Sequence, residues 1–348
     1  VAYCGRTYAG FLLEKTPRNI RNNDKMIYHY DFRYTLVKLP VKAALRLNFR
    51  KLVFIGRKEN VSREKPVIFA PNHRNALLDA LLLVYASYHK KQIVFLARAD
   101  IFKQQFVAWL LRGMRIMPVF RMRDGKDNLD KNNEIFRNAA RILKKKNPLA
   151  IFPEGRHNPK QSLLPIQKAV PRIVLPTEAS LDFQLHNQIV PVAIYYRDIS
   201  DFLTDAYVTF GTPIDVPEYK DLYHENPSRA INQLRQDMEK SLQSMVVNIK
   251  NDEFYEEYCW AIDWNGDKIA REKFSERKDD YLQASLHIVR KLDDLHENNP
   301  AAFNTKIASF REARNILNSE GLNTKDRIWK RSNKGNLFAR FSALILFA

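Results

Sequence analysis

One histidine and one aspartate six positions apart, His73 and Asp79, have the residue types of a general base and its orienting partner. On a continuous helix their side chains would lie about 120° apart, so they meet only if a loop carries His73 and the next helix begins near Asp79. Asn72 or Asn75 could cap that helix. The carboxylate would then bind imidazole Nδ1 and leave Nε2 to accept a proton. Taken alone, the pair favours a surface histidine and an ordinary aspartate at a helix start.

A carboxylate and several cations occur further along the chain. Glu154 lies in Phe-Pro-Glu-Gly-Arg, where Gly155 permits a sharp turn and a buried carboxylate would need cationic or hydrogen-bonding partners. Arg121 ends an apolar run, and a guanidinium there could hold a phosphate through paired hydrogen bonds. A surface arginine explains Arg121 equally well. Lys168 is a further candidate cation, although a solvated lysine on a helix face is the more ordinary explanation.

Short β-rich runs alternate with helical patterns from residue 52 onwards. This alternation predicts an α/β layered fold with a largely parallel sheet flanked by helices. The strand candidates are Leu52–Ile55, Val67–Ala70, Ile93–Leu96, Ile116–Phe120, Leu149–Phe152, Ile189–Tyr196 and Ala206–Phe210. The helical patterns are 76–88, 101–112 and 128–146, followed beyond Val216 by 228–250, 268–298 and 300–318. A C-terminal helical extension is therefore expected after the α/β core.

Three polar motifs follow strand candidates directly. His73 comes after the run 67–70, Arg121 after 116–120, and Glu154 after 149–152. Ligands of open α/β sheets bind outside the carboxyl ends of the strands, so these three side chains are expected to converge in one crevice. No serine or cysteine is obviously paired with His73, which favours direct base catalysis over a covalent enzyme intermediate.

These motifs resemble those of the glycerolipid acyltransferases, a family that includes the 1-acylglycerol-3-phosphate acyltransferases. The family pattern is a histidine–aspartate motif, a motif ending in arginine, a Phe-Pro-Glu-Gly motif and a Val-Pro-Val-like strand. This chain shows His73 with Asp79, then Arg121, Phe152–Gly155 and Val190–Ile194, in that order. The resemblance covers about residues 40–220. Two departures bear on the substrate: five residues separate the histidine from the aspartate where four is commonest, and Arg-His follows the third motif where Thr-Arg is usual.

The resemblance implies that an acyl group moves from a thioester to the hydroxyl of a lysophospholipid or glycerol phosphate, with 1-acylglycerol-3-phosphate as the favoured acceptor and phosphatidate as product. His73 would deprotonate the hydroxyl and Asp79 would orient the imidazole. The implied acceptor-binding residues are Arg121, Glu154, Gly155, Arg156 and Lys168. Acyl-CoA or acyl-carrier protein would be the co-substrate, and no other cofactor or metal is expected, because the eight histidines show no ligand spacing. The open alternatives are a catalytically inactive membrane-associated scaffold and a basic nucleic-acid-binding protein.

The charge of the chain is large and uneven. The sequence has 57 Lys and Arg against 39 Asp and Glu, a net charge of +18, with a pI of about 9.7. Residues 1–60 carry +9 and residues 101–170 carry +10, whereas residues 251–300 carry −6. Such an excess indicates a polyanionic partner, either nucleic acid or an anionic membrane surface. No zinc-finger, RNP or helix-turn-helix signature accompanies it, and the family resemblance favours the membrane.

A basic stripe recurs every four residues in the helical pattern of residues 34–51, at Lys38, Lys42, Arg46 and Arg50. Most of the remaining surface is apolar. This pattern predicts an amphipathic helix at the membrane interface, with the cationic side chains reaching lipid phosphates. The alternative is a core helix with one solvated charged edge. The acidic 251–300 region is expected to face away from lipid.

The expected organisation has five parts. Residues 1–33 form a leader, 34–51 the membrane-associating helix, 52–216 the acyltransferase α/β domain, 217–340 a helical C-terminal region, and 341–348 the start of a truncated apolar segment. The chain begins at Val1, so we expect a fragment whose native start could be Met26. No apolar run in the sequence is long enough for a complete transmembrane helix. The predicted location is the cytoplasmic face of a membrane.

Overall fold

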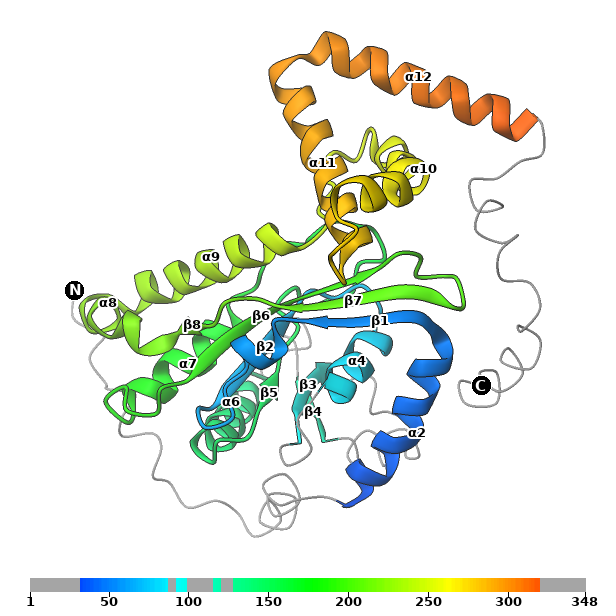
Figure 1. Cartoon of the computed structure of the whole chain (residues 1–348). Coiled ribbons are helices and arrows are strands. Elements are labelled where there is room, and N and C mark those ends of the chain that lie inside the picture. Colours follow the sequence, from blue (N-terminus) through cyan, green and yellow to red (C-terminus); the bar gives the residue numbers. More distant parts are fainter. Residues whose placement is uncertain (1–31, 87–91, 99–114, 120–127, 320–348) are drawn as a thin grey trace.

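The computed structural model describes residues 32–86, 92–98, 115–119 and 128–319, and these residues form a sheet with helices on both faces (Figure 1). The first half contains α2 (Phe32–Asn48), β1 (Phe49–Ile55), α3 (Arg57–Asn60), β2 (Val67–Pro71), α4 (Leu78–Ala86), β3 (Val94–Arg98), β4 (Ile116–Val119), α6 (Asn128–Lys144), β5 (Leu149–Ala150) and α7 (Ala169–Ala179). The second half contains β6 (Gln188–Tyr196), β7 (Thr204–Phe210), β8 (Ile214–Asp215), a 3₁₀ turn (Val216–Tyr219), α8 (Lys220–Glu225), α9 (Pro227–Met245), α10 (Tyr255–Lys273), α11 (Asp280–Asn298) and α12 (Pro300–Ser319).

The sheet has the strand order β1-β7-β6-β2-β5-β3-β4, with β8 paired to β6. The five strands from β6 to β4 run parallel to one another, and β7 is antiparallel to β6. β1 pairs parallel to β7 and therefore also runs against the central five. The predicted layered α/β fold with a largely parallel sheet is confirmed, and the reversed strands lie together at one edge.

One face of the sheet is covered by α2 and α4. Successive residues of a strand point to opposite faces, so Val67 and Phe69 of β2 pack on this side. Leu81, Leu82 and Leu83 of α4 bury against them. This packing fixes the start of α4 beside the carboxyl end of β2.

The opposite face carries two sets of helices. Ile68 and Ala70 of β2 pack with α6, α7 and α9 in one apolar cluster. Beyond them, Tyr195 of β6 and Tyr207 of β7 pack against α10, α11 and α12. The C-terminal helices therefore share a core with the reversed edge of the sheet, as their position above β7 in Figure 1 also shows.

Several predicted boundaries differ from the structure. The expected helix 34–51 ends at Asn48, because the β-rich run from Phe49 pairs with β7. Arg50 is consequently a strand residue. The prediction of a single helix over residues 268–298 is wrong, because residues 274–279 separate α10 from α11. The two helices pack closely: a Cβ added at Gly266 of α10 would lie 2.7 Å from the ring of Tyr281 on α11. The expected helix 101–112 lies outside the described residues.

One helix that the sequence patterns did not indicate is α7. It contains Pro171 and Pro176, and proline is unfavourable inside a helix. Val170, Ile173 and Val174 of α7 are fully or almost fully buried, so tertiary packing outweighs that local preference.

Candidate active site

The loop that follows β2 is fixed to the neighbouring strand β6. Asn72 donates from Nδ2 to the carbonyl of Ile194 (3.1 Å) and accepts at Oδ1 from the amide of the same residue (2.6 Å). The side chain of Asn72 therefore extends the sheet ladder by one step rather than capping a helix. Asn75 is the cap, because its Oδ1 accepts from the amides of Leu77 (3.2 Å) and Leu78 (3.0 Å) at the start of α4.

His73 lies on this loop and Asp79 on the first turn of α4, so the pair meets in the way that the sequence requires. The Nδ1 of His73 is 2.9 Å from Oδ2 of Asp79. The imidazole side chain is 13% exposed, and the carboxylate is completely buried. Within the described residues no hydrogen-bond partner occupies Nε2 of His73.

Asp79 is held by four donors. Besides the imidazole, its Oδ2 accepts from the amides of Arg74 and Asn75, each at 2.8 Å. Its Oδ1 accepts from the hydroxyl of Tyr196 at 2.6 Å. Burial and the neighbouring Asp79 carboxylate raise the pKa of Tyr196 well above its ordinary value, so the hydroxyl stays protonated and donates. A carboxylate fixed in this way sets the orientation of the His73 ring.

Phe152 forms one wall of the site. Its ring stacks on the imidazole of His73 with centroids 3.9 Å apart and planes 23° apart. His157 approaches the same imidazole edge-on at 6.1 Å. The His73 ring is thus restrained by an aromatic face as well as by Asp79.

Glu154 points inward and holds two loops together. Its Oε1 accepts from the amide of His73 (2.7 Å) and its Oε2 from the amide of Leu164 (2.9 Å). Burial raises the pKa of Glu154 to about 7, although these two amide donors and the nearby His73 act in the opposite direction. The turn behind it depends on Gly155, whose φ of 71° lies in the left-handed region. The described contacts of Glu154 therefore support the loop that carries His73.

The structure does not bring the predicted cations of its described part, Arg156 and Lys168, into contact with His73. Arg121 lies outside the described residues. Arg156 and Lys168 have exposed side chains on the segment that follows Glu154, and Lys168 immediately precedes α7. Among the described residues neither cation shows a contact with His73 or Glu154.

Sequence reasoning missed Arg74 and Tyr196. Arg74 is 8% exposed and donates from Nη2 to the carbonyl of Pro159 (2.7 Å), and its buried Nε has no hydrogen-bond partner among the residues that the structure describes. Tyr196 ends β6 and reaches Asp79 across the sheet. The one signal for Tyr196 was its place at the end of a strand next to β2, but strand order is not written in the local sequence.

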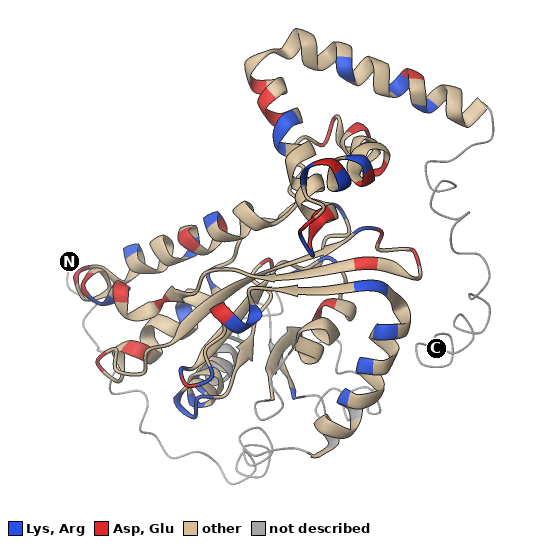
Figure 2. Cartoon of the chain, in the orientation of Figure 1, with Lys and Arg blue, Asp and Glu red and all other residues tan. Residues whose placement is uncertain are grey.

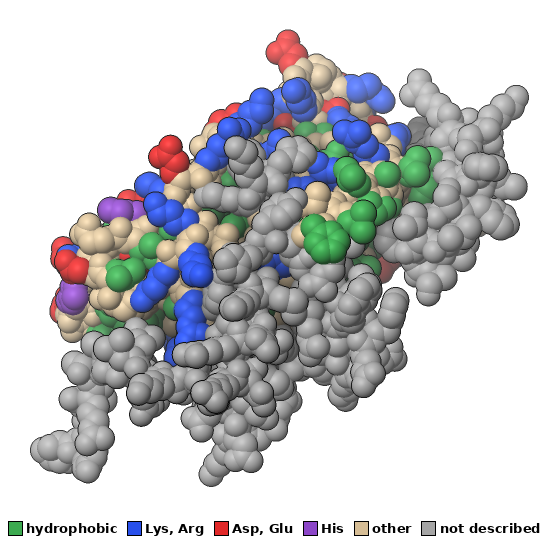
Figure 3. Space-filling view, turned by 90° about the horizontal axis from the view of Figure 1, so that it is seen from below, with side chains coloured by type: hydrophobic (Ala, Val, Ile, Leu, Met, Phe, Trp, Pro, Cys, Tyr) green, Lys and Arg blue, Asp and Glu red, His purple; other side chains and the backbone are tan. Residues whose placement is uncertain are grey.

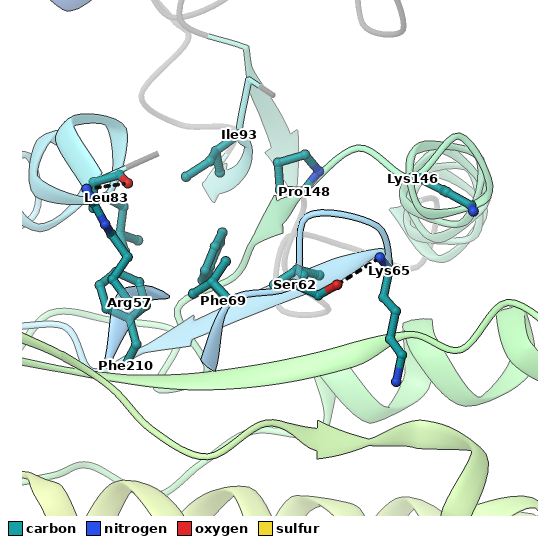
Figure 4. Close-up of a pocket in the computed structure, with 12 residues that line it drawn as sticks. Arg57, Ser62, Lys65, Phe69, Leu83, Ile93, Lys146, Pro148 and Phe210 are labelled. Carbon is teal, nitrogen blue, oxygen red and sulfur yellow. Dashed lines mark hydrogen bonds between the residues drawn. The ribbon is translucent and has the colours of Figure 1, made fainter. Parts of the chain in front are cut away.

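A separate pocket lies at the other end of β2. It is narrow and partly open to solvent, and Val67, Phe69, Leu83, Ile93 and Phe210 form its apolar wall (Figure 4). Arg57, Lys65 and Lys146 also line it. Since Val67 begins β2 and His73 follows its end, this pocket is distinct from the histidine site.

The basic stripe predicted on α2 is only partly turned toward the protein, because Lys38 is buried and Lys42 is half-buried, whereas Arg46 is exposed. Lys38 is 6% exposed, and burial together with the charges of Lys42 and Arg57 lowers its pKa to about 8. Lys42 lies over the ring of Tyr85, and Arg46 donates to the Tyr85 hydroxyl (3.0 Å). Figure 2 marks these cations along the α2 ribbon.

The outward side of α2 is apolar. Its side chains Phe32, Leu36, Leu39 and Leu47 are 71%, 67%, 67% and 52% exposed. Seen from below, hydrophobic side chains gather on the part of the molecule where α2 lies (Figure 3). Leu77, on the loop between His73 and Asp79, is also exposed. We call the four α2 residues the apolar row.

Two kinds of feature do not occur among the described residues. No group of three or more His, Cys, Asp or Glu side chains there could hold a metal ion. None of the helices in the described part of the chain is both long enough and apolar enough to cross a membrane.

Comparisons with known proteins point to one family. A family model described as Acyltransferase matches residues 53–195. Glycerol-3-phosphate O-acyltransferase 2 of Saccharomyces cerevisiae is 30% identical over 118 residues, which are 34% of this chain and 16% of that protein. Glycerol-3-phosphate O-acyltransferase 1 of the same yeast is 31% identical over 106 residues, 29% of this chain and 14% of its own length. The matches thus span about a sixth of these relatives.

Among solved structures, the 1-acyl-sn-glycerophosphate (LPA) acyltransferase PlsC of Thermotoga maritima aligns with 70% of this chain and 89% of its own. The sequence identity is 20% and the TM-score is 0.41.

Proposed function

Since residues 53–195 match the Acyltransferase family model and the motifs resemble those of glycerolipid acyltransferases, we propose that this chain transfers a fatty acyl group from an acyl thioester to the hydroxyl of a glycerol phosphate or a lysophospholipid. The observation that carries this proposal is the contact between Nδ1 of His73 and Asp79, with Nε2 bonded to none of the described residues. That arrangement supports a general base and occurs in the motif that the family resemblance assigns to catalysis.

The proposed reaction needs one proton acceptor. Nε2 of His73 takes the proton of the acceptor hydroxyl. At the same time the oxygen of that hydroxyl attacks the carbonyl carbon of the thioester. The C–S bond then breaks, the ester remains, and the thiolate takes the proton back from the imidazolium. Asp79 stabilises that imidazolium and keeps the neutral ring in the tautomer with its proton on Nδ1.

For the acceptor phosphate we propose the cations Arg121, Arg156 and Lys168, with Glu154 and Gly155 shaping the turn that carries Arg156. Exposure of Arg156 and Lys168 near the Glu154 turn supports their access to a ligand. Arg156→Ala should raise the apparent KM for a phosphate-bearing acceptor several-fold and leave kcat nearly unchanged. Lys240→Ala on α9, which also removes an exposed cation, is the matched control. An unchanged KM in Arg156→Ala would remove this residue from the proposed site.

The acceptor is best identified by comparing two products. The sequence motifs favour 1-acylglycerol-3-phosphate, whereas the names of the yeast relatives favour glycerol 3-phosphate. The purified chain should be given palmitoyl-CoA or palmitoyl-acyl-carrier protein with each acceptor, and lysophosphatidate and phosphatidate measured separately. Product from either acceptor supports acyl transfer and identifies the preferred pair of substrates. Absence of product with every pair would favour the inactive scaffold.

An anionic membrane surface is the proposed partner, with the chain on its cytoplasmic face. The apolar row of α2 supports contact through inserted side chains, and Arg46, which is exposed beside it, could reach lipid phosphates. Leu36→Asp with Leu39→Asp should reduce sedimentation with phosphatidylglycerol–phosphatidylcholine vesicles several-fold. Leu181→Asp, at an exposed leucine outside α2, should sediment like the unmodified chain. Full vesicle binding by the double variant would contradict this docking surface.

A further inference from the structure

The segment between Gly155 and α7, residues 156–168, forms neither helix nor strand, and we call it the bridging loop. It lies between the elements that carry His73 and the segment that leads into the C-terminal helices. A stretch of this length has a large conformational entropy in isolation, so its position depends on the contacts that it makes. Those contacts run in two directions.

On the inner side, the bridging loop bonds to the loop that carries His73. The amide of Asn158 donates to the carbonyl of His73 at 2.7 Å. The guanidinium of Arg74 donates to the carbonyl of Pro159, also at 2.7 Å. The amide of Leu164 donates to Glu154, whose other oxygen binds the His73 amide. Both backbone polar groups of His73 are thereby tied, directly or through Glu154, to the bridging loop.

On the outer side, the same loop bonds to residues after α9. The amide of Gln161 donates to the hydroxyl of Tyr255 (2.8 Å), and the amide of Leu163 donates to Oδ1 of Asn248 (2.9 Å). The carbonyl of Gln161 accepts from the amide of Ile249 at 2.7 Å. Along the loop, the inner bonds at Asn158 and Leu164 lie on either side of these outer bonds.

A further ionic contact strengthens the outer side. Nζ of Lys160 is 2.8 Å from Asp252 and lies 5.1 Å from the centre of the Tyr255 ring. The Lys160 side chain is 49% exposed and the Asp252 side chain 79% exposed, so this pair contributes less than the partly buried amide bonds.

The helices that provide Tyr255 are themselves fixed to the sheet. The hydroxyl of Tyr195 on β6 bonds to Ser285 of α11 at 3.0 Å. Arg197, just after β6, forms a two-bond contact with Asp267 of α10 (2.8 and 2.7 Å) and stacks 3.9 Å from the ring centre of Tyr281. The outer partners of the bridging loop are therefore held against the strand that also supplies Tyr196 to Asp79.

We propose that Tyr255 and Asn248 are positioning residues of the catalytic histidine, acting through the bridging loop, so that the C-terminal helical region is required for full turnover. This inference rests on the proposed role of His73 as general base. Its physical reason is that a loop released on its outer side no longer fixes the backbone of His73, and small displacements of a catalytic group lower the rate steeply.

The experiment compares Tyr255→Phe with Tyr258→Phe on the full chain. Tyr258 lies on the same helix and donates its hydroxyl to Asp293 at 2.8 Å, away from the loop, so it is a matched control for losing one hydroxyl. Tyr255→Phe should lower kcat about fivefold or more, the effect of one hydrogen bond, while the KM for the acyl donor stays the same. Tyr258→Phe should keep the kcat of the unmodified chain. Hydrogen exchange should quicken in residues 72–79 and 156–164 only in Tyr255→Phe.

Asn248 provides a second test with rescue. Asn248→Ala removes the acceptor for the Leu163 amide and should lower kcat about fivefold, whereas Asn248→Asp keeps an acceptor oxygen and should restore most of the rate. Unchanged kcat in both Tyr255→Phe and Asn248→Ala would overturn the proposal. So would equal losses in Tyr255→Phe and Tyr258→Phe, because these would indicate general destabilisation.

His73→Ala separates this inference from the proposed function. If His73→Ala retains activity, the general-base role itself fails. If His73→Ala is inactive while Tyr255→Phe and Asn248→Ala turn over normally, the base stands and the positioning role is wrong.

Discussion

Two neighbouring strands, β2 and β5, each lead into a loop that depends on a buried carboxylate, and the two carboxylates differ in their partners. Asp79 accepts four hydrogen bonds, one of them from the Tyr196 hydroxyl and one from His73. From the described part of the chain, Glu154 accepts two, both from backbone amides. Burial disfavours a charged carboxylate unless donors compensate, and for Glu154 the remaining imbalance raises the pKa to about 7. The comparison suggests that Asp79 orients the reacting ring, whereas Glu154 supports the backbone beneath it.

The largest effect should come from Asp79→Asn. The substitution keeps the size of the side chain but removes its negative charge. Asp79 accepts hydrogen bonds at both oxygens, whereas an amide has only one acceptor oxygen. The side chain therefore no longer holds His73 in the tautomer with its proton on Nδ1. We expect kcat to fall about a thousandfold. Circular dichroism should show that the variant keeps the secondary-structure content of the unmodified chain. Turnover within tenfold of the unmodified chain would mean that the two carboxylates do not differ in the way described.

A smaller loss is expected from Glu154→Gln, because one oxygen still accepts while the new amide group faces a backbone N–H. We expect a reduction in kcat of about tenfold. A kcat as low as that of Asp79→Asn would instead make Glu154 an equal partner in the chemistry.

The same variant tests the charge state of Glu154. Because the folded-state pKa of about 7 lies above the ordinary 4.5, the folded chain binds the proton more tightly than the unfolded chain. The stability contribution of Glu154 is therefore greatest below about pH 4.5 and declines as the pH rises to about 7, by about 3 kcal/mol at most. Urea unfolding between pH 5 and 8 should show this decline in the unmodified chain and not in Glu154→Gln. Parallel pH dependences in the two proteins would argue against a neutral Glu154.

The smallest effect should come from Tyr196→Phe. This change removes the hydrogen bond to Oδ1 of Asp79 and leaves the three bonds to Oδ2, including the one from His73. We expect a loss of about 1–3 kcal/mol in the free energy of unfolding and a reduction in kcat of less than tenfold. Thermal unfolding and steady-state assays measure the two effects separately. A rate loss as large as that of Asp79→Asn would place the hydroxyl in the chemistry rather than behind it.

The local parts of this comparison could be predicted from sequence. His73 and Asp79 are close in the chain, so helix geometry alone decides whether they can meet. The same reasoning offered Asn72 or Asn75 as the cap of α4, and the structure shows that Asn75 is the cap. The partners Tyr196 and Asn248 could not be found in this way, because they are brought to the site by strand order and by packing of the C-terminal helices.

The predicted surface of α2 shows a different limitation. A helix with one cationic stripe and an apolar remainder has two possible orientations, and the sequence pattern does not state which side is buried. Tyr85 of α4 provides a ring and a hydroxyl for Lys42 and Arg46, which favours the orientation with the apolar row outward. Arg121 stays a prediction, since it lies outside the described residues.

The most direct measurement of the central claim is acyl transfer by the unmodified chain and by His73→Ala, with palmitoyl-CoA and both glycerol 3-phosphate and 1-acylglycerol-3-phosphate. Removing the proposed base while Asp79 and Glu154 remain should lower kcat by about a thousandfold with every active substrate pair and leave the melting temperature nearly the same. Activity of His73→Ala within tenfold of the unmodified chain would contradict the account.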